Sequence, residues 1–315
     1  MEKRRLGNSN LYVAPLAFGG NVFGWTVDEK TAFTLLDRFV DAGLNLIDTA
    51  DIYSGFAPGV PFGSSETIIG AWLKQRGRRD DVLIATKVGM SMGEGRSGLA
   101  GARIRAAVDE SLQRLQTDYI DLYQAHQDDP TVPLEETLDA FAGLIKAGKV
   151  RAIGASNYSQ ARLLEALAVS ARLGLPRYES LQPLYNLYER ADFETNLRPL
   201  MLQQNIGVIN YYALAAGFLT GKYRSEADFG KSPRGGRMAR YLNPRGKAIL
   251  AALDGAAAAY HATPGQIALA WVMAQPGVTA PIASATSLAQ LNESIAATTI
   301  TLDADTLAAL NHASA

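Results

Sequence analysis

The hexapeptide VLIATK at residues 82–87 shows the feature that decides the fold, an apolar run that ends in a small or polar residue. Runs that stay apolar on successive positions suit parallel strands buried on both faces. Seven other segments share this form: LAFGG (16–20), LNLIDTA (44–50), YIDLYQAH (119–126), VRAIGAS (150–156), SLQPLYN (180–186), GVINYYAL (207–214) and TAPIAS (279–284). The chain is therefore predicted to contain eight parallel strands.

Amphipathic helices are expected between these strands. Asp28 has the side chain of a helix cap, and Gly43 follows the end of that helix. Pro133 and Gly148 flank another, which matches the preference for proline at the start and glycine after the end. The expected helices are residues 28–41, 64–77, 134–147, 159–172, 192–204, 264–275 and 287–297, and the alanine-rich stretch 256–264 is also predicted to be helical. Alternating strands and helices without a long linker predict a single (β/α)₈ TIM barrel domain over residues 1–315.

Two segments lie outside this repeat. Residues 3–13, KRRLGNSNLYV, predict a β-hairpin around Gly7-Asn8-Ser9 that could plug the floor of the barrel. Residues 217–244 are rich in glycine, arginine and lysine and are too long for a routine connection. A long loop of this kind in a compact domain is usually functional, and we expect a flexible lid on the C-terminal face.

The composition excludes several classes of protein. The formal net charge of −1 argues against a nucleic-acid or anionic-membrane surface. The chain has no cysteine, which excludes disulfides, thiolate metal sites and a cysteine nucleophile. Its first residues lack the apolar run of a signal peptide, and no segment has the apolar length of a membrane span. A cytoplasmic location is expected, and the oligomeric state is left open.

Four polar residues fall at the ends of predicted strands, where the active sites of such barrels lie. Asp48 closes the second strand, Tyr53 lies in the loop after it, Lys87 ends the third strand and His126 ends the fourth. Each also has an ordinary structural explanation, as a turn cap, a packed ring, a solvent-directed amine or a core histidine. A buried ammonium would need a counter-ion, however, and Asp48 is the natural partner of Lys87.

The segments DTADIY, IATK, DLYQAH and IGASN resemble, in order and spacing, the signature segments of the aldo-keto reductase superfamily, over residues 3–298. The resemblance implies that Tyr53 is the general acid, that Lys87 and Asp48 tune it, and that His126 orients the carbonyl. It also implies NADPH, or less often NADH, bound across the barrel mouth.

This assignment agrees with the chemistry of carbonyl reduction. A hydride that reaches a carbonyl carbon leaves charge on the oxygen, which needs a proton donor. Free tyrosine has a pKa of about 10, and a neighbouring Lys87 ammonium is expected to lower the pKa of Tyr53. His126 and Tyr53 can both bond to the developing oxyanion, and no metal is needed.

The resemblance also implies a cofactor site. Ser156, Asn157 and Gln182 would hold the nicotinamide carboxamide, and Tyr211 would stack on its ring. The family usually continues after that tyrosine with Ser-Pro-Leu, whereas this chain has Tyr212-Ala213-Leu214, so the backbone path to Leu214 is open to change.

Gly217 to Lys222 matches the family segment for the pyrophosphate. The basic residues that follow are either a solvated loop or contacts for phosphate or substrate, and they are Arg224, Lys231, Arg234, Arg237 and Arg240.

The adenosine phosphate would lie at Ser284, Thr286, Gln290 and Glu293. Family members often have arginine where Thr286 stands and asparagine where Ser294 stands, so the case for strict NADPH selectivity is weaker. NADPH is still favoured, because Ser284 and a helix N-terminus at Ser287 can receive an anion.

The substrate is expected to be a small aldehyde or ketone, and its mouth is expected to be framed by Phe23, Trp25, Tyr53, Phe56, Gln127, Asp128 and the loop 89–98. The segment 55–63 lengthens the loop after Tyr53 and could reshape the pocket. Two rival functions stay open. A lysine at a strand end can serve a Schiff-base aldolase, with Lys87 forming the imine. The chain also resembles, in outline, the potassium-channel β subunits, which are non-catalytic regulatory subunits that bind a nicotinamide cofactor.

Overall fold

A computed structural model describes residues 2–93, 95–232 and 234–315. Within these ranges, all eight predicted strands are present, although several are shorter than their apolar runs. They are β3 (Ala17–Gly19), β4 (Leu46–Asp48), β5 (Leu83–Val88), β6 (Ile120–Ala125), β7 (Val150–Ser156), β8 (Ser180–Gln182), β9 (Gly207–Val208) and β10 (Ile282–Ala283).

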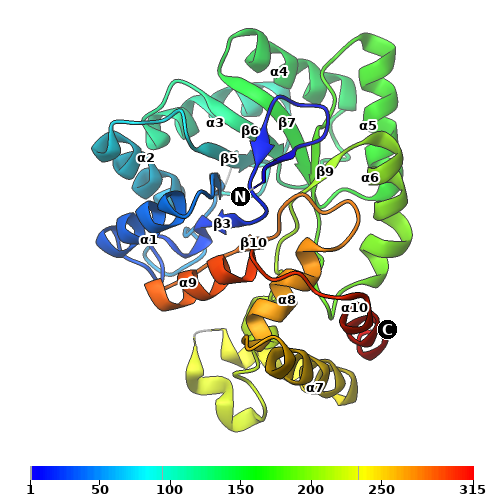
Figure 1. The fold of residues 1–315 in the computed structure, drawn as a ribbon. Helices are drawn as coiled ribbons and strands as arrows, with labels where there is room; N and C mark the ends of the chain where they lie inside the picture. The colour runs from blue at the N-terminus through cyan, green and yellow to red at the C-terminus, as the bar shows by residue number, and fades with distance from the viewer. Residues whose placement is uncertain (1, 94, 233) are drawn as a thin grey trace.

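These strands form one parallel sheet that closes on itself. Their order is β10-β3-β4-β5-β6-β7-β8-β9. The free edges meet where the carbonyl oxygen of Val208 accepts from the backbone N–H of Thr279 at 2.8 Å, and where Ile282 N–H donates to Asn210 O at 2.9 Å. Helices surround the strands on the outside (Figure 1). The (β/α)₈ barrel is confirmed.

The helices follow the expected capping signals. Asp28 accepts a hydrogen bond from Thr31 N–H at 2.8 Å, and Gly148 takes the left-handed conformation with φ 73°. Two helices, α3 and α10, lie outside the predicted set. The helices are α1 (Glu29–Asp41), α2 (Ser64–Arg76), α3 (Gly101–Leu115), α4 (Leu134–Lys146), α5 (Gln160–Leu173), α6 (Arg198–Gln204), α7 (Pro244–Ala259), α8 (Pro264–Met273), α9 (Leu288–Ala297) and α10 (Ala304–Ala313). In the part of the chain that the structure describes, none of them has the length and apolar character needed to cross a bilayer.

Helix prediction was wrong for residues 260–263. Helix α7 ends at Ala259, and His261 has a left-handed φ of 51°. Thr263 then caps α8, because its hydroxyl accepts from Gln266 N–H and the Gln266 side chain accepts from Thr263 N–H. A proline at the first position of α8 fits this capping box, so two helices replace a continuous one.

The loop segments contain short helical turns. Residues 192–204, predicted as one helix, contain a π-helical turn at Phe193–Leu197 before α6. The 217–244 segment is built mainly of 3₁₀ turns, and it is tied to α7 by the ion pair of Arg224 and Asp254 at 2.7 Å. The turns are η1 (Gly20–Val22), η2 (Phe193–Leu197), η3 (Ala215–Thr220), η4 (Glu226–Lys231) and η5 (Gly235–Arg240).

The N-terminal hairpin plugs the barrel, as the sequence predicts. Strands β1 (Arg4–Arg5) and β2 (Tyr12–Val13) pair antiparallel, and the hairpin crosses the centre of the ring of strands (Figure 1). The buried hairpin residues Leu6, Leu11 and Val13 pack in one apolar cluster with strand residues that include Leu46 and Leu122. Apolar side chains therefore close the floor of the barrel.

Strand register places polar side chains directly above this apolar layer. Side chains two positions apart on a strand share a face. Leu46 and Asp48, Ala85 and Lys87, and Leu122 and Gln124 form such pairs, and the lower member of each lies in the cluster with the hairpin. Asp48, Lys87 and Gln124 therefore face the barrel interior one step nearer its C-terminal end.

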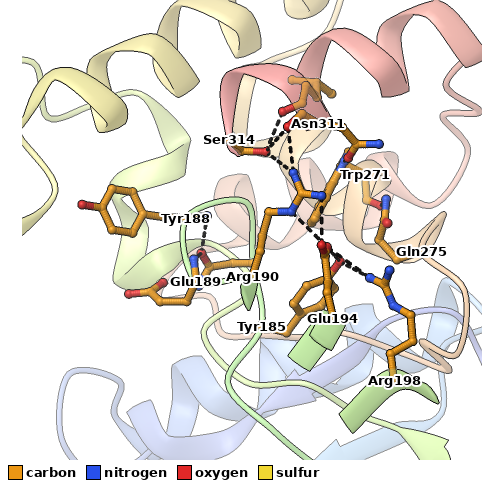
Figure 2. Close-up of polar contacts among 12 residues, drawn as sticks. Tyr185, Tyr188, Glu189, Arg190, Glu194, Arg198, Trp271, Gln275, Asn311 and Ser314 are labelled. Atoms are coloured by element: carbon orange, nitrogen blue, oxygen red, sulfur yellow. Dashed lines mark hydrogen bonds and ion pairs between the residues drawn. The ribbon is translucent and has the colours of Figure 1, made fainter. Parts of the chain in front are cut away.

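A partly buried ionic network holds the C-terminal helix α10 to the loop after β8 (Figure 2). The Arg190 guanidinium pairs with Glu194 at 2.9 Å, and it donates to Asn311 O at 2.9 Å and to the Ser314 hydroxyl at 2.6 Å. The same loop carries Asn186, whose side chain donates to the carbonyl oxygen of Tyr212 at 2.9 Å. The anchoring of α10 thus supports a segment at the barrel mouth.

Close packing of α2 on α3 yields a stability prediction with a matched control. A Cβ added at Gly70 would lie 2.1 Å from the Arg114 carbonyl oxygen, whereas a Cβ at Gly143 in α4 would meet nothing within 4 Å. Gly70→Ala should therefore destabilise the protein by about 1–3 kcal/mol, because backbone must move. Gly143→Ala should stabilise it by about 0.5–1 kcal/mol, since alanine is the better helix former. Urea unfolding of both variants measures this, and equal effects of one sign would contradict the packing described.

Candidate active site

Three of the four predicted catalytic residues form one hydrogen-bonded group at the C-terminal end of the barrel. The Lys87 ammonium donates to Asp48 Oδ2 at 2.7 Å, to the Thr49 carbonyl oxygen at 2.7 Å and to the Tyr53 hydroxyl at 3.0 Å. The side chain of Lys87 is fully buried, and that of Asp48 is 2% exposed. All three protons of the ammonium therefore have an acceptor, as a buried charge requires.

His126 lies beside this group without bonding to it. Its ring is 5.8 Å from that of Tyr53, centroid to centroid, and nearly perpendicular to it. Burial and the positive charge of Lys87 hold the pKa of His126 well below its usual range, so the imidazole is neutral at pH 7. Nδ1 is buried and lacks a hydrogen-bond partner among the described residues. A neutral ring in this position can donate one hydrogen bond toward the mouth.

Asp48 is itself held by two glutamines. Gln182 Nε2 donates to Asp48 Oδ1 at 2.9 Å, and Gln124 Nε2 lies 3.4 Å from the same oxygen. Sequence reasoning gave Gln182 another role and missed Gln124. The strand alternation could have found it, because Gln124 lies on β6 two positions before His126, the residue that follows the strand.

The electrostatics correct one expectation. Burial alone would lower the pKa of Lys87, but the charge of Asp48 and the hydrogen bonds to Asp48 and Tyr53 outweigh it and raise that pKa above the usual value. The pKa of Tyr53 is raised as well, whereas the sequence predicted a lower one. Burial of the hydroxyl exceeds the opposing effect of the Lys87 ammonium. Tyr53 is thus a neutral phenol at pH 7 whose ionised form would lie 3.0 Å from a cation.

The predicted nicotinamide residues lie at the same C-terminal end of the barrel. Asn157 donates to the His126 carbonyl oxygen at 2.9 Å and accepts from the Tyr211 hydroxyl at 2.9 Å. Ser156 donates to the Gln182 carbonyl oxygen at 2.9 Å. The Nε2 of Gln182 is the atom that bonds to Asp48. No donor among the described residues reaches the other atom of this amide, Oε1. That amide oxygen is suited to accept from a ligand N–H, so these residues fit a carboxamide.

The segment after Tyr211 has an unusual backbone. Tyr212, Ala215 and Ala216 have left-handed φ values of 55°, 48° and 55°. Non-glycine residues held in this region store strain, and such residues concentrate at functional sites. Leu214 N-caps η3, and a Cβ added at Gly217 would lie 3.6 Å from Lys222 Nζ. Gly217 and Lys222, predicted to hold pyrophosphate, therefore lie together.

The predicted adenosine residues form a second group near α9. The Thr286 backbone N–H donates to Gln290 Oε1 at 2.9 Å, and Ser284 donates to Asn21 Oδ1 at 2.7 Å. Glu293 instead accepts from the Thr263 hydroxyl at the start of α8. Thr286 also lines a pocket with residues of the loop before α1: Gly24, Trp25, Thr26, Val27, Asp28 and Thr31. Another pocket lies at the C-terminal ends of α2 and α3, and it contains none of the predicted site residues.

A buried acidic pair behind β5 was missed by sequence reasoning. Glu66 pairs with Arg114 at 2.7 Å and accepts from Thr86. Asp51 is fully buried, and among the described residues its carboxyl oxygens have no hydrogen-bond partner, although Arg103 lies 3.6 Å away. Burial and the neighbouring charge of Glu66 raise the pKa of Asp51 to about 7.

Comparison with known proteins identifies the class. Residues 15–315 match the model of the Aldo/keto reductase family. The chain is 37% identical over 275 residues to Aldo-keto reductase YhdN of Bacillus subtilis (strain 168), which covers 85% of this chain and 78% of that protein.

Two further relatives match almost the whole chain. The Uncharacterized oxidoreductase YrpG of the same organism is 36% identical, over 99% of this chain and 95% of its own length. A Probable voltage-gated potassium channel subunit beta of Arabidopsis thaliana is 33% identical, over 94% and 91%. The chain therefore belongs to the aldo/keto reductase family, and its family and relatives support an oxidoreductase.

The raised pKa of Asp51 predicts a pH-dependent stability. Between about pH 4 and pH 7 the unfolded chain releases the Asp51 proton while the folded chain keeps it, so this residue makes the protein less stable as the pH rises through that window. Asp51→Asn should therefore be more stable than the wild type at pH 8, by about 2–4 kcal/mol, with the gap shrinking at pH 4. Urea unfolding at both pH values tests this, with Asp80→Asn as a surface control whose parent side chain is 85% exposed. A gap of the same size at both pH values would show that Asp51 is not protonated in the folded protein.

Proposed function

We propose that this protein reduces aldehyde or ketone carbonyls to alcohols, with NADPH as the preferred hydride donor, NADH as the possible substitute, and Tyr53 as the general acid. The observation that supports this most strongly is the position of the Lys87 ammonium, 3.0 Å from the Tyr53 hydroxyl and 2.7 Å from the Asp48 carboxylate. Family membership supports the nicotinamide chemistry and a small carbonyl substrate.

In this mechanism the chain manages the proton and the bound nicotinamide supplies the hydride. Tyr53, which is neutral at pH 7, donates its proton to the carbonyl oxygen as negative charge builds there. The resulting phenolate lies beside Lys87, whose positive charge stabilises it. Asp48 keeps Lys87 charged and fixed, and the neutral His126 donates a second hydrogen bond to the same oxygen.

The cofactor would be held by the residues that the sequence predicts. Ser156, Asn157 and Gln182 would bind the carboxamide, and Tyr211, whose hydroxyl is held by Asn157, would support the ring. Leu214, Gly217 and Lys222 would contact the pyrophosphate. The adenosine end would contact Ser284, Thr286, Gln290 and Glu293. The oxygen of Gln182 that no described donor reaches supports the first of these assignments.

The two rival functions are supported less well. A Schiff-base aldolase needs a neutral amine, whereas the raised pKa of Lys87 and its three acceptors keep this lysine charged. The regulatory alternative has specific support, because relatives are named as potassium channel subunits. The proximity of all four predicted catalytic residues favours turnover. A single domain over residues 1–315 and a cytoplasmic location stay predictions.

Tyr53→Phe should lower kcat/KM for carbonyl reduction by about 10²–10⁴-fold, because it removes the proton donor. NADPH affinity should change little, since this hydroxyl bonds to Lys87 rather than to the predicted cofactor residues. Loss of reduced-nicotinamide absorbance over a panel of aldehydes and ketones measures turnover. Tyr12→Phe, at a residue 52% exposed, is the matched control and should keep full activity. Retained turnover in Tyr53→Phe would remove the residue from its role.

NADPH should bind more tightly than NADH, because Ser284 and the N-terminus of α9 offer donors to a 2′-phosphate. Fluorescence titration of both cofactors gives the two dissociation constants. Ser284→Ala should narrow the difference between them. A large preference for NADH would overturn the NADPH assignment. The reason would then be that Thr286 stands where many family members have an arginine that binds the 2′-phosphate.

A further inference from the structure

Arg234 places a cation at the mouth of the barrel. It belongs to the 217–244 segment, and its guanidinium lies over the Trp25 ring at 5.4 Å from the centroid. Trp25 in turn packs edge-on against Phe56, with centroids 5.3 Å apart. Phe56 follows Tyr53 by three residues, so these contacts join Arg234 to the loop that carries the proposed general acid.

Tyr212 lies beside Tyr211, the residue predicted to face the nicotinamide. The two rings pack edge-on with centroids 5.3 Å apart, and the Tyr211 hydroxyl donates to Asn157. The backbone of Tyr212 is fixed in a left-handed conformation, and its carbonyl oxygen accepts from Asn186. Arg234 is thus joined to the loop of Tyr53 through Trp25 and Phe56.

Arg234 has no counter-ion within the described ranges. Its guanidinium is partly buried, and neither an ion pair nor a side-chain hydrogen bond forms to it from residues 2–93, 95–232 or 234–315. Three of the other basic residues of the segment are paired: Arg224 with Asp254 and Lys231 with Asp228, both at 2.7 Å, and Arg240 with Glu189 at 3.3 Å.

Among the described residues, no carboxylate contributes to the pKa of Arg234. Burial lowers its pKa, the positive charge of Arg237 lowers it further, and only the hydroxyls of Tyr212 and Tyr223 oppose this. A partly desolvated cation without an acceptor is unfavourable, and an anion from outside would relieve it.

We propose that Arg234 binds a carboxylate of the substrate, so that the preferred substrates are aldehydes or ketones that carry an acidic group away from the carbonyl. This inference rests on the proposed reductase function and deepens it. The guanidinium lies over the Trp25 ring, and a guanidinium offers parallel N–H donors that match the two oxygens of a carboxylate. A phosphate of the cofactor could also pair with a guanidinium. Gly217 and Lys222, which lie close together, are however the residues predicted to hold the pyrophosphate.

Matched substrate pairs test this assignment. Straight-chain aldehydes that end in a carboxylate are compared with their methyl esters over a range of chain lengths. The wild type should have the higher kcat/KM for the acids, mainly through a lower KM. Arg234→Met should lower kcat/KM for the acids by about 10- to 150-fold and leave the esters nearly unchanged. Arg234→Lys should retain part of the preference, because it keeps the charge and loses the planar fork.

Arg237→Met is the control, since it removes the same charge from an exposed neighbour and should leave the acid preference intact. Equal losses for acids and esters in Arg234→Met, or a wild type without acid preference, would overturn the proposal. Titration with NADPH in the absence of substrate tests whether Arg234 instead binds a phosphate of the cofactor. If Arg234→Met weakens NADPH binding as much as it lowers kcat/KM, the residue serves a cofactor phosphate and the proposal fails.

A binding readout covers the case in which no aldehyde is reduced. Trp25 contacts Arg234 directly, so its fluorescence should report a bound carboxylate. The NADPH-loaded wild type should bind straight-chain ω-hydroxy acids, and Arg234→Met should not. Binding without turnover would overturn the reductase function and keep the carboxylate site. Equal binding by both proteins, or by neither, would overturn the carboxylate site itself.

Discussion

The ion pair between Lys87 and Asp48 is the interaction on which the rest of the site depends. Two opposite charges in a barrel interior lose their hydration, and their attraction offsets this loss only when their remaining hydrogen-bonding capacity is met. Thr49 and Tyr53 complete the acceptors of the ammonium, and Gln124 and Gln182 donate to the carboxylate. The barrel thereby fixes a cation beside a phenol, which is the arrangement that proton donation to a developing alkoxide requires.

Strand register explains why this polar group is stable where it lies. The apolar layer below it, closed by the N-terminal hairpin, keeps water from the floor. Gly154 on β7 leaves the space that the neighbouring side chains occupy, since a Cβ there would lie 2.2 Å from Ser180 Oγ and 3.2 Å from Gln124 Cγ. A small residue inside the barrel is therefore as necessary to the geometry as the charged ones.

The residues at the mouth of the barrel are held in place differently from those at its floor. Its residues come from long segments that cross the strand ends, and they are held by ties to outer helices, such as Arg190 to α10 and Arg224 to α7. The left-handed residues from Tyr212 to Gly217 place strain where a ligand would be bound. A rigid interior can thus supply one chemistry, while the mouth sets which molecules reach it.

The sequence alone determined the eight strands, most helix caps and the four polar strand ends, because local periodicity and the convergence of parallel strands require no knowledge of packing. It also indicated Asp48 as the partner of Lys87. Only the tertiary structure decided that Gln124 and Gln182 hold Asp48, that burial raises rather than lowers the pKa of Tyr53, and that Asp51 has no hydrogen-bond partner among the described residues. The place of Arg234 on Trp25 belongs to the same group. Each of these depends on desolvation or on contacts between distant segments, and neither quantity is encoded in the local order of residues.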